Sequence, residues 1–327
     1  MKIRQGGGGL KAAAAAVWLA ATACAPAAAS VMLPSPATRP WRPVTIRVQV
    51  RERTALVVRE VPLEDYVATA ALSEVHPDSQ DPALAQRMFE VQTVIARTYA
   101  IANRRRHTKD GFDLCSTTHC QLYEPARLTT SRWAAAAATA ARRTAGDLLC
   151  FAGMPVNAVF HADCGGHTSN AAAVWGGVTP AYLAGTADRG AAARAHTDWT
   201  FDTRMSVLRT ALNGDPRTTV GARLDRIEIA GRDFAGRAEM ILLRGTRTFV
   251  VRGEVFRDVV TRALGVKTLR STLFSIKVSE GLVMFSGKGF GHGVGLCQAG
   301  ALARLKAGDS PTDVLEHYFP GAAIEKR

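Results

Sequence analysis

Apolar and polar residues alternate over residues 44–62, in the runs VTIRVQV and TALVVREV. A period of two places successive side chains on opposite faces of a strand, so we expect two strands that form a hairpin. Residues 63–74 change to a helical period, with side chains on one face at Tyr66, Val67, Ala70 and Ala71. This helix must end near Val75, because Pro77 disfavours helical backbone before it.

A second, longer helix is predicted to begin at Asp81 and Pro82, since aspartate is a good capping residue and proline suits the first helical turn. Its apolar residues recur every three or four positions as far as about residue 105. Residues 128–144 are rich in alanine and predict another helix, and residues 147–162 predict a hairpin with Gly153 in its turn. Residues 206–286 begin with a helical stretch and continue with short β-like segments, which indicates a second module.

The first 29 residues have the features of an export signal. Basic residues precede an apolar stretch, 12–23, that is too short to span a bilayer comfortably, and small residues follow at 27–29. Cys24, in the sequence ATAC, loosely matches the box that directs lipid attachment, so a lipid anchor is the alternative to simple cleavage. Residues 30–43 contain four prolines and are typical of a linker. We therefore expect an exported protein of the cell envelope, periplasmic or extracellular.

The net charge is +13, of which the predicted signal carries three positive charges. The remaining excess favours an anionic partner. Nucleic acid is not expected for an exported chain without a zinc-finger, RRM or helix-turn-helix signature, whereas an acidic wall polymer suits the compartment. Five cysteines remain when Cys24 is set aside, and an odd number argues against a disulfide scaffold.

Cysteine and histidine are concentrated in the segment DLCSTTHCQLY, residues 113–123. Cys115, His119 and Cys120 have the spacing C-x3-H-C, and thiolate and imidazole groups at this density favour zinc. A disulfide between the two cysteines is the next alternative, followed by free thiols. Glycine-rich stretches at 160–168, 175–177 and 287–301 lack the βαβ context that a dinucleotide-binding fingerprint requires.

Taken together, five segments resemble the stage II sporulation protein D (SpoIID/LytB) family. They are EVPLEDYVATAALSEVHP at 60–77, VQTVIARTYA at 91–100, DLCSTTHCQLY at 113–123, FHADCGGHTSNAAAVWGG at 160–177 and GKGFGHGVGLCQAGA at 287–301. They occur in the order of the family. The resemblance implies an α+β fold, in which a cleft separates a helix-containing catalytic core from a smaller, β-rich inserted module.

The expected organisation follows from the resemblance and the signal. A signal peptide (1–29) and a linker (30–43) precede the first part of the catalytic core (44–190). The β-rich module covers 191–285. A C-terminal glycine-rich loop and helix (286–327) complete the core.

The resemblance also implies lytic transglycosylase action on the glycan strands of peptidoglycan, with a preference for strands stripped of peptides. The single catalytic glutamate of the family corresponds to Glu74. Hydrolytic glycosidases usually need two carboxyl groups. One suffices here, because the C6 hydroxyl of N-acetylmuramate attacks its own anomeric carbon and forms a 1,6-anhydro sugar. Apolar burial would have to raise the pKa of Glu74 toward neutrality.

Other positions of the family pattern imply contacts with the glycan. Gln92, Arg97 and Thr98 lie along the second predicted helix, and Arg97 would contact the lactyl carboxylate of muramic acid. The alternative for Arg97 is a surface ion pair. His292 and Gln298 would form hydrogen bonds to sugar, and the alternative for His292 is a structural histidine.

Some members of the family hold a zinc ion at the 113–123 segment by two cysteines and a histidine. The resemblance therefore implies Cys115, His119 and Cys120 as ligands, with His107 as a further candidate and a structural role preferred to a catalytic one.

Two more cysteines, Cys164 and Cys297, stand where many family members carry serine. The resemblance suggests that they are neighbours and form a disulfide, or else two small buried residues. Related LytB-type proteins are thought to modify an amidase. The alternative function is therefore a non-catalytic cell-wall-binding protein with an amidase partner, which would not need Glu74.

Overall fold

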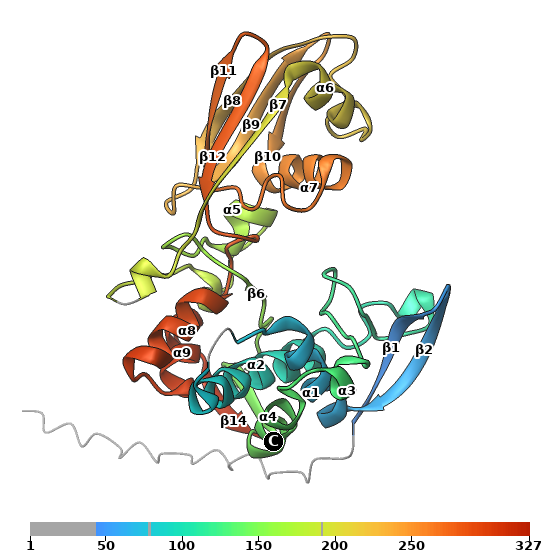
Figure 1. Ribbon diagram of the computed structural model, residues 1–327, viewed down its shortest axis with the longest axis vertical. Coiled ribbons are helices and arrows are strands. Elements are labelled where there is room, and N and C mark those ends of the chain that lie inside the picture. The colour runs from blue at the N-terminus through green and yellow to red at the C-terminus, as the bar shows by residue number, and fades with distance from the viewer. Residues whose placement is uncertain (1–43, 78–79, 191) are drawn as a thin grey trace, which may run out of the picture. The chain divides into compact units, whose positions relative to one another are not determined.

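The computed structural model describes residues 44–77, 80–190 and 192–327 (Figure 1). The predicted signal peptide, the linker and Cys24 lie outside the described residues. Helices and small sheets are mixed along the described chain, so the predicted α+β class is confirmed. No helix in this part of the chain combines the length and apolar character needed to cross a membrane.

The helices are α1 (Leu63–Glu74), α2 (Pro82–Ala102), α3 (Arg127–Thr130), α4 (Ala134–Arg143), α5 (Ala171–Trp175), α6 (Met205–Asn213), α7 (Gly253–Leu264), α8 (Gln298–Ala307) and α9 (Pro311–Tyr318). The strands are β1 (Thr45–Glu52), β2 (Ala55–Pro62), β3 (Leu114–Cys115), β4 (Asp147–Phe151), β5 (Met154–Pro155), β6 (Phe160–His161), β7 (Asp198–Arg204), β8 (Leu224–Arg232), β9 (Ala238–Gly245), β10 (Thr248–Arg252), β11 (Phe274–Ser279), β12 (Leu282–Lys288), β13 (Leu296–Cys297) and β14 (Ala323–Lys326). They form the sheets β2-β1-β3, β14-β4-β5, β13-β6, β10-β9-β8 and β11-β12-β7.

The predicted hairpin and first helix are both confirmed. β1 and β2, the blue strands of Figure 1, pair antiparallel from Thr45 opposite Pro62 to Glu52 opposite Ala55. α1 follows at once and has the predicted bounds. It ends where Val75 adopts an extended conformation, just before His76, the residue at which Pro77 disfavours helical backbone. Glu74 is therefore the last residue of the helix.

The second helix is capped as predicted and runs through the core. The Asp81 carboxylate accepts hydrogen bonds from the N–H groups of Ala83 and Leu84, at 2.9 and 3.2 Å. Fourteen residues of α2 are buried, because the helix has neighbours on most of its faces. It ends at Ala102, a few residues earlier than the pattern indicated.

Three expectations differ from the structure. The alanine-rich segment forms two helices, α3 and α4, because Ser131 is extended and interrupts the helical hydrogen bonds. The 147–162 segment does turn at Ala152 and Gly153, both at positive φ. However, β6 leaves this hairpin and pairs parallel with β13. The β-like region also contains α7, whose helical period the short segments concealed.

Buried apolar residues gather in two clusters. The first draws on residues between Ile46 and Leu183 and again between Val294 and Ala322. The second draws only on residues between Trp199 and Phe285. The chain thus returns to its first core after the residues between Leu183 and Val294. The domain boundaries and the cleft between the parts stay predictions.

Candidate functional site

Glu74 lies at the C-terminal end of α1, where its carboxyl group is half-buried. The Leu122 N–H donates a hydrogen bond of 2.6 Å to Glu74 Oε1. Among the described residues, the second oxygen, Oε2, has no hydrogen-bond partner. One carboxyl oxygen is therefore held by the backbone, and the other is available to a ligand.

Burial raises the pKa of Glu74 to about 7, from an ordinary value of 4.5. The hydrogen bond from Leu122 opposes this shift, because it stabilises the carboxylate. The negative charge of Glu124 adds to it. A carboxyl group with such a pKa can hold a proton at neutral pH and also release it, as a general acid and base must do.

The loop after Cys120 is hydrogen-bonded to the last two residues of α1, Ser73 and Glu74. Ser73 Oγ accepts a hydrogen bond of 2.9 Å from the Glu124 N–H, and Glu74 accepts the bond from Leu122. The Ser73 hydroxyl in turn donates to Thr69 O within the helix, at 2.7 Å. These bonds fix the loop against the carboxyl group.

The structure brings together His107, Cys115, His119 and Cys120, whose ligand atoms all lie within 4.8 Å of one another. Cys120 Sγ is 3.4 Å from His107 Nε2, and His119 Nδ1 is 3.7 Å from each sulfur. A tetrahedral zinc ion with bonds of about 2.0–2.3 Å separates its ligand atoms by roughly 3.3–3.8 Å. Two sulfurs and two imidazole nitrogens at these distances fit zinc.

Two further features prepare this cluster for a cation. The hydrogen bond with Cys120 lowers the pKa of Cys115 well below its usual range, which favours a thiolate at this sulfur. Asp110 Oδ2 lies 3.1 Å from His107 Nδ1, which turns Nε2 toward the cluster. All five cysteines from Cys115 onward are free in the structure, and the alternative of a Cys115–Cys120 disulfide stays untested.

Tyr66, which interacts with both Glu74 and the cysteine cluster, was not among the predicted site residues. Tyr66 is buried, and its ring stacks on Tyr123 with the centroids 5.2 Å apart. Burial raises the pKa of Tyr66, and the charges of Cys120 and Glu74 raise it further. Its hydroxyl has no hydrogen-bond partner within the described chain. The available signal was its position two helical turns before Glu74 on the same face of α1.

Arg97 lies on α2, as the resemblance implied, but its side chain is bonded within the protein. Its side chain is fully buried, with hydrogen bonds of 2.9 and 2.5 Å to the Glu64 carboxylate. Backbone oxygens of Ala141 and Asp147 accept further bonds. Arg97 is therefore a buried structural partner of α1, and a carboxylate of a glycan has no access to it here.

The other helical candidates have similar structural roles. The Thr98 hydroxyl is buried, donates to Val94 O and accepts from the Leu149 N–H. Gln92 is also buried, and its Oε1 accepts a bond of 3.2 Å from Gln298 Nε2. The structure thus joins two predicted residues, Gln92 and Gln298, in one pair.

His292 is held by the backbone through both ring nitrogens. Nε2 lies 2.9 Å from Phe160 O, and Nδ1 accepts a bond from the Val294 N–H. Burial lowers the pKa of His292 to about 4, so the ring is neutral. The structural interpretation of this histidine fits these contacts better than a hydrogen bond to sugar.

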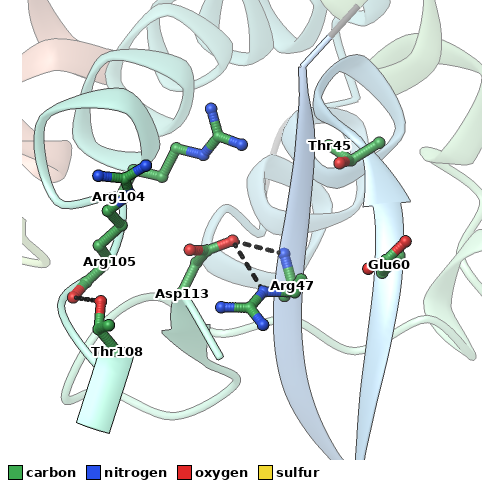
Figure 2. A pocket seen from close by; sticks show the side chains of 7 residues that line it. All are labelled: Thr45, Arg47, Glu60, Arg104, Arg105, Thr108 and Asp113. Atoms are coloured by element: carbon green, nitrogen blue, oxygen red, sulfur yellow. Dashed lines mark hydrogen bonds and ion pairs between the residues drawn. The ribbon is translucent and has the colours of Figure 1, made fainter. Parts of the chain in front are cut away.

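Figure 2 shows a pocket that contains none of the predicted site residues. Asp113 accepts a hydrogen bond from the Arg47 N–H, and Arg104 and Arg105 line the side opposite Arg47. Three of the lining residues, Arg104, Arg105 and Thr108, are close to His107 in the sequence. Its cationic lining contributes to the positive charge of the molecule but brings no catalytic group to Glu74.

Comparisons with known proteins cover the residues of this site. The family model described as "Stage II sporulation protein" matches residues 51–151, which include Glu74 and the Cys/His cluster. The chain is 28% identical to stage II sporulation protein D of Bacillus amyloliquefaciens, over 82% of this chain and 76% of that protein. The protein of that name from Bacillus subtilis is 26% identical over 82% of this chain and 76% of its own length.

A third relative has a different name. The amidase enhancer of Bacillus subtilis is 25% identical over 77% of this chain, and the match covers 40% of that longer protein. The resemblance expected from the five sequence segments is therefore confirmed: residues 51–151 match the stage II sporulation protein family model, and most of the chain is similar to proteins named stage II sporulation protein D.

Proposed function

We propose that this protein is an exported, cell-wall-directed lytic transglycosylase that cleaves the bond between N-acetylmuramate and N-acetylglucosamine in peptidoglycan. A cell-wall-related role is supported by the family and by the name of the amidase enhancer relative. The finer assignment depends on one observation, the half-buried Glu74 with its pKa near 7 and one bonded oxygen.

One carboxyl group can perform both proton transfers of this reaction. Protonated Glu74 donates its proton to the glycosidic oxygen as the bond from C1 to that oxygen breaks. The resulting carboxylate accepts the proton of the C6 hydroxyl, whose oxygen bonds to C1 and closes the 1,6-anhydro ring. The proton count is unchanged at the end, and no water is consumed. The Leu122 N–H holds Oε1 in place throughout, so Oε2 is the oxygen that exchanges the proton.

Zinc would be held by His107, Cys115, His119 and Cys120, and it would supply a fixed crosslink for the loop that carries Leu122. The donor set fits this role, because four protein ligands leave no open coordination position for chemistry. The proton transfers remain with Glu74.

The pH dependence of cleavage should report the pKa of Glu74. Only the protonated acid can assist departure of the leaving group, so kcat/KM should be level in mildly acidic buffer and fall up to tenfold per unit above about pH 7. Initial rates between about pH 5 and about pH 9 measure this. A rate that rises through neutrality would mean that Glu74 acts as a carboxylate in the free enzyme.

Peptide-free glycan strands should be cut faster than intact peptidoglycan, as the resemblance implies. The rate should also fall with added salt, because the net charge of +10 that remains without the predicted signal (13 − 3) attracts the carboxylates of the polymer and salt screens that attraction. Chromatography and mass spectrometry of the products from both substrates measure the preference. Equal cutting of the two substrates contradicts the preference, whereas a salt-independent rate contradicts only the charge argument.

The relative named amidase enhancer supports a second candidate, a wall-binding protein that changes the action of an amidase. The two functions separate in one assay. Purified protein incubated alone with peptide-free strands should release 1,6-anhydro products. If strands stay intact but a cell-wall amidase becomes faster when this protein is added, the second function is the correct one.

A further inference from the structure

A second group of metal-binding side chains lies outside the site described above. It consists of Cys164, Asp188, His196 and Cys297, whose ligand atoms all lie within 4.8 Å of one another. Cys164 follows β6, Asp188 and His196 precede β7, and Cys297 ends β13. Residues from 164 to 196, together with Cys297 about a hundred positions later, thus place two sulfurs, one imidazole and one carboxylate around a common point.

The distances within this group suit a single small cation. Asp188 Oδ2 is 3.1 Å from Cys164 Sγ and 3.3 Å from His196 Nε2, and that nitrogen is 4.0 Å from Cys164 Sγ. Ligand atoms around tetrahedral zinc are separated by roughly 3.3–3.8 Å. Small shifts of these side chains would complete the arrangement.

The histidine is oriented in the way that zinc-binding histidines usually are. His196 Nδ1 lies 2.6 Å from Asp163 Oδ1, which leaves Nε2 facing the sulfurs. Asp163 is itself fixed by the N–H groups of Gly165 and Thr197, at 2.8 and 2.9 Å. On the other side, Tyr318 Oη donates to Asp188 Oδ1 at 2.6 Å and leaves Oδ2 for the cluster.

Backbone N–H groups surround both sulfurs, as they do in thiolate sites. Cys297 Sγ accepts from the N–H groups of Cys164 and Gly300, at 3.2 and 3.3 Å. Cys164 Sγ accepts from the Gly166 N–H at 3.3 Å. A side chain at Gly300 would lie 2.5 Å from Asp188 Oδ2, so the glycine keeps space for that carboxylate.

Burial decides what this group can do. Cys164 and Cys297 are 0% exposed, and the side chains of His196 and Asp188 are 1% and 0% exposed. The Cys164, His196 and Asp163 alignment has the order of a nucleophile, base and orienting acid, but no substrate can reach a fully buried sulfur. Four enclosed ligands instead match a closed structural metal site.

We propose that Cys164, Asp188, His196 and Cys297 bind a structural zinc ion, separate from the one at the Cys115 segment. The ion would crosslink two parts of the chain, one just before β7 and one after β12. It would therefore hold together the two ends of the segment that forms the second apolar cluster. It would also explain why Cys164 and Cys297, which the resemblance suggested as a disulfide pair, are free thiols in the structure.

The test counts metal in full-length protein purified without a polyhistidine tag from zinc-containing medium. Elemental analysis should find about two zinc ions per wild-type chain, and about one in Cys115→Ser and in Cys297→Ser. The double variant should contain none. Cys150→Ser is the matched control, since Cys150 is buried in β4 outside both groups, and it should keep both ions. Cobalt added to Cys115→Ser should give the charge-transfer absorption of a thiolate site.

If Cys297→Ser does not fold, a milder variant takes its place in the test. Asp163→Asn keeps all four ligands and replaces the carboxylate behind His196 by a neutral amide, so zinc affinity in the Cys115→Ser background should fall roughly 10- to 100-fold. The proposal is overturned if folded Cys115→Ser contains no zinc and binds no cobalt, or if thiol titration shows Cys164 and Cys297 oxidised. None of these readings depends on glycan cleavage.

Discussion

Glu74→Gln is expected to lower the release of 1,6-anhydromuramic products by roughly 10²- to 10⁴-fold, the usual contribution of general acid–base catalysis. Glutamine keeps an oxygen for the Leu122 N–H but cannot exchange a proton with the substrate. Product release from peptide-free strands, followed by mass spectrometry, measures the effect. Asp65→Asn is the matched control, because Asp65 is an exposed acid in the first turn of the same helix, and it should cut at the wild-type rate.

The stability of the glutamine variant shows whether the loss is chemical. The folded pKa of Glu74 lies above its ordinary value, so the unfolded chain releases the proton first as pH rises from about 4.5 to about 7. Ionisation therefore costs stability above that range, by up to about 3 kcal/mol. Glu74→Gln should unfold at a higher denaturant concentration than wild type above pH 7, and the difference should vanish in acid.

Two outcomes contradict the catalytic assignment in different ways. Cleavage at the wild-type rate by Glu74→Gln would remove this residue from the mechanism. Products with reducing muramic ends from the wild-type protein would mean hydrolysis, which needs a second carboxylate. Glu124 would then be the residue to test, because its charge acts on Glu74.

Cys115→Ser should lose one equivalent of zinc and a large part of the protein's stability. Binding to the folded state alone adds RT ln(1 + [L]/Kd), which is about 4 kcal/mol at a free zinc concentration a thousandfold above Kd. Metal content and thermal unfolding measured on the same sample test this. Cleavage at low temperature should persist, because Glu74 performs the proton transfers. Cys150→Ser, which alters a buried thiol outside the cluster, controls for the loss of a cysteine as such.

Removal of the metal by a chelator separates a catalytic role of the ion from a structural one, which Cys115→Ser alone does not. If a chelator abolishes cleavage while circular dichroism shows an intact fold, the metal takes part in the chemistry. If wild-type protein contains no metal at this site and thiol titration shows Cys115 and Cys120 oxidised, the disulfide alternative is correct.

The sequence predicted the local elements around Glu74 well. The alternation before Pro62, the helical face of residues 63–74 and the proline at 77 are local signals, and they place the carboxyl group at a helix end. The Cys115 segment was also visible, because three of its four ligands lie within six residues. Such patterns depend only on residues that are close in sequence, so the elements they predict are also found in the folded structure.

Other assignments depended on neighbours that a sequence does not reveal. Arg97 and Thr98 occupy polar positions of α2, but this helix has neighbours on most of its faces, and both side chains are buried. The group around Cys164 is invisible for a related reason. Asp188 and His196 lie in irregular segments, and Cys297 approaches them only after more than a hundred residues of intervening chain.

The hydrogen bond from Leu122 to Glu74 makes proton binding and metal binding thermodynamically linked. Leu122 lies two residues after Cys120, so an ion at the cysteine segment restricts the donor that stabilises the Glu74 carboxylate. Such coupling is reciprocal. A zinc ion at this segment would then lower the proton affinity of Glu74, and protonation of Glu74 would lower the affinity for zinc by the same factor, although the two groups share no ligand.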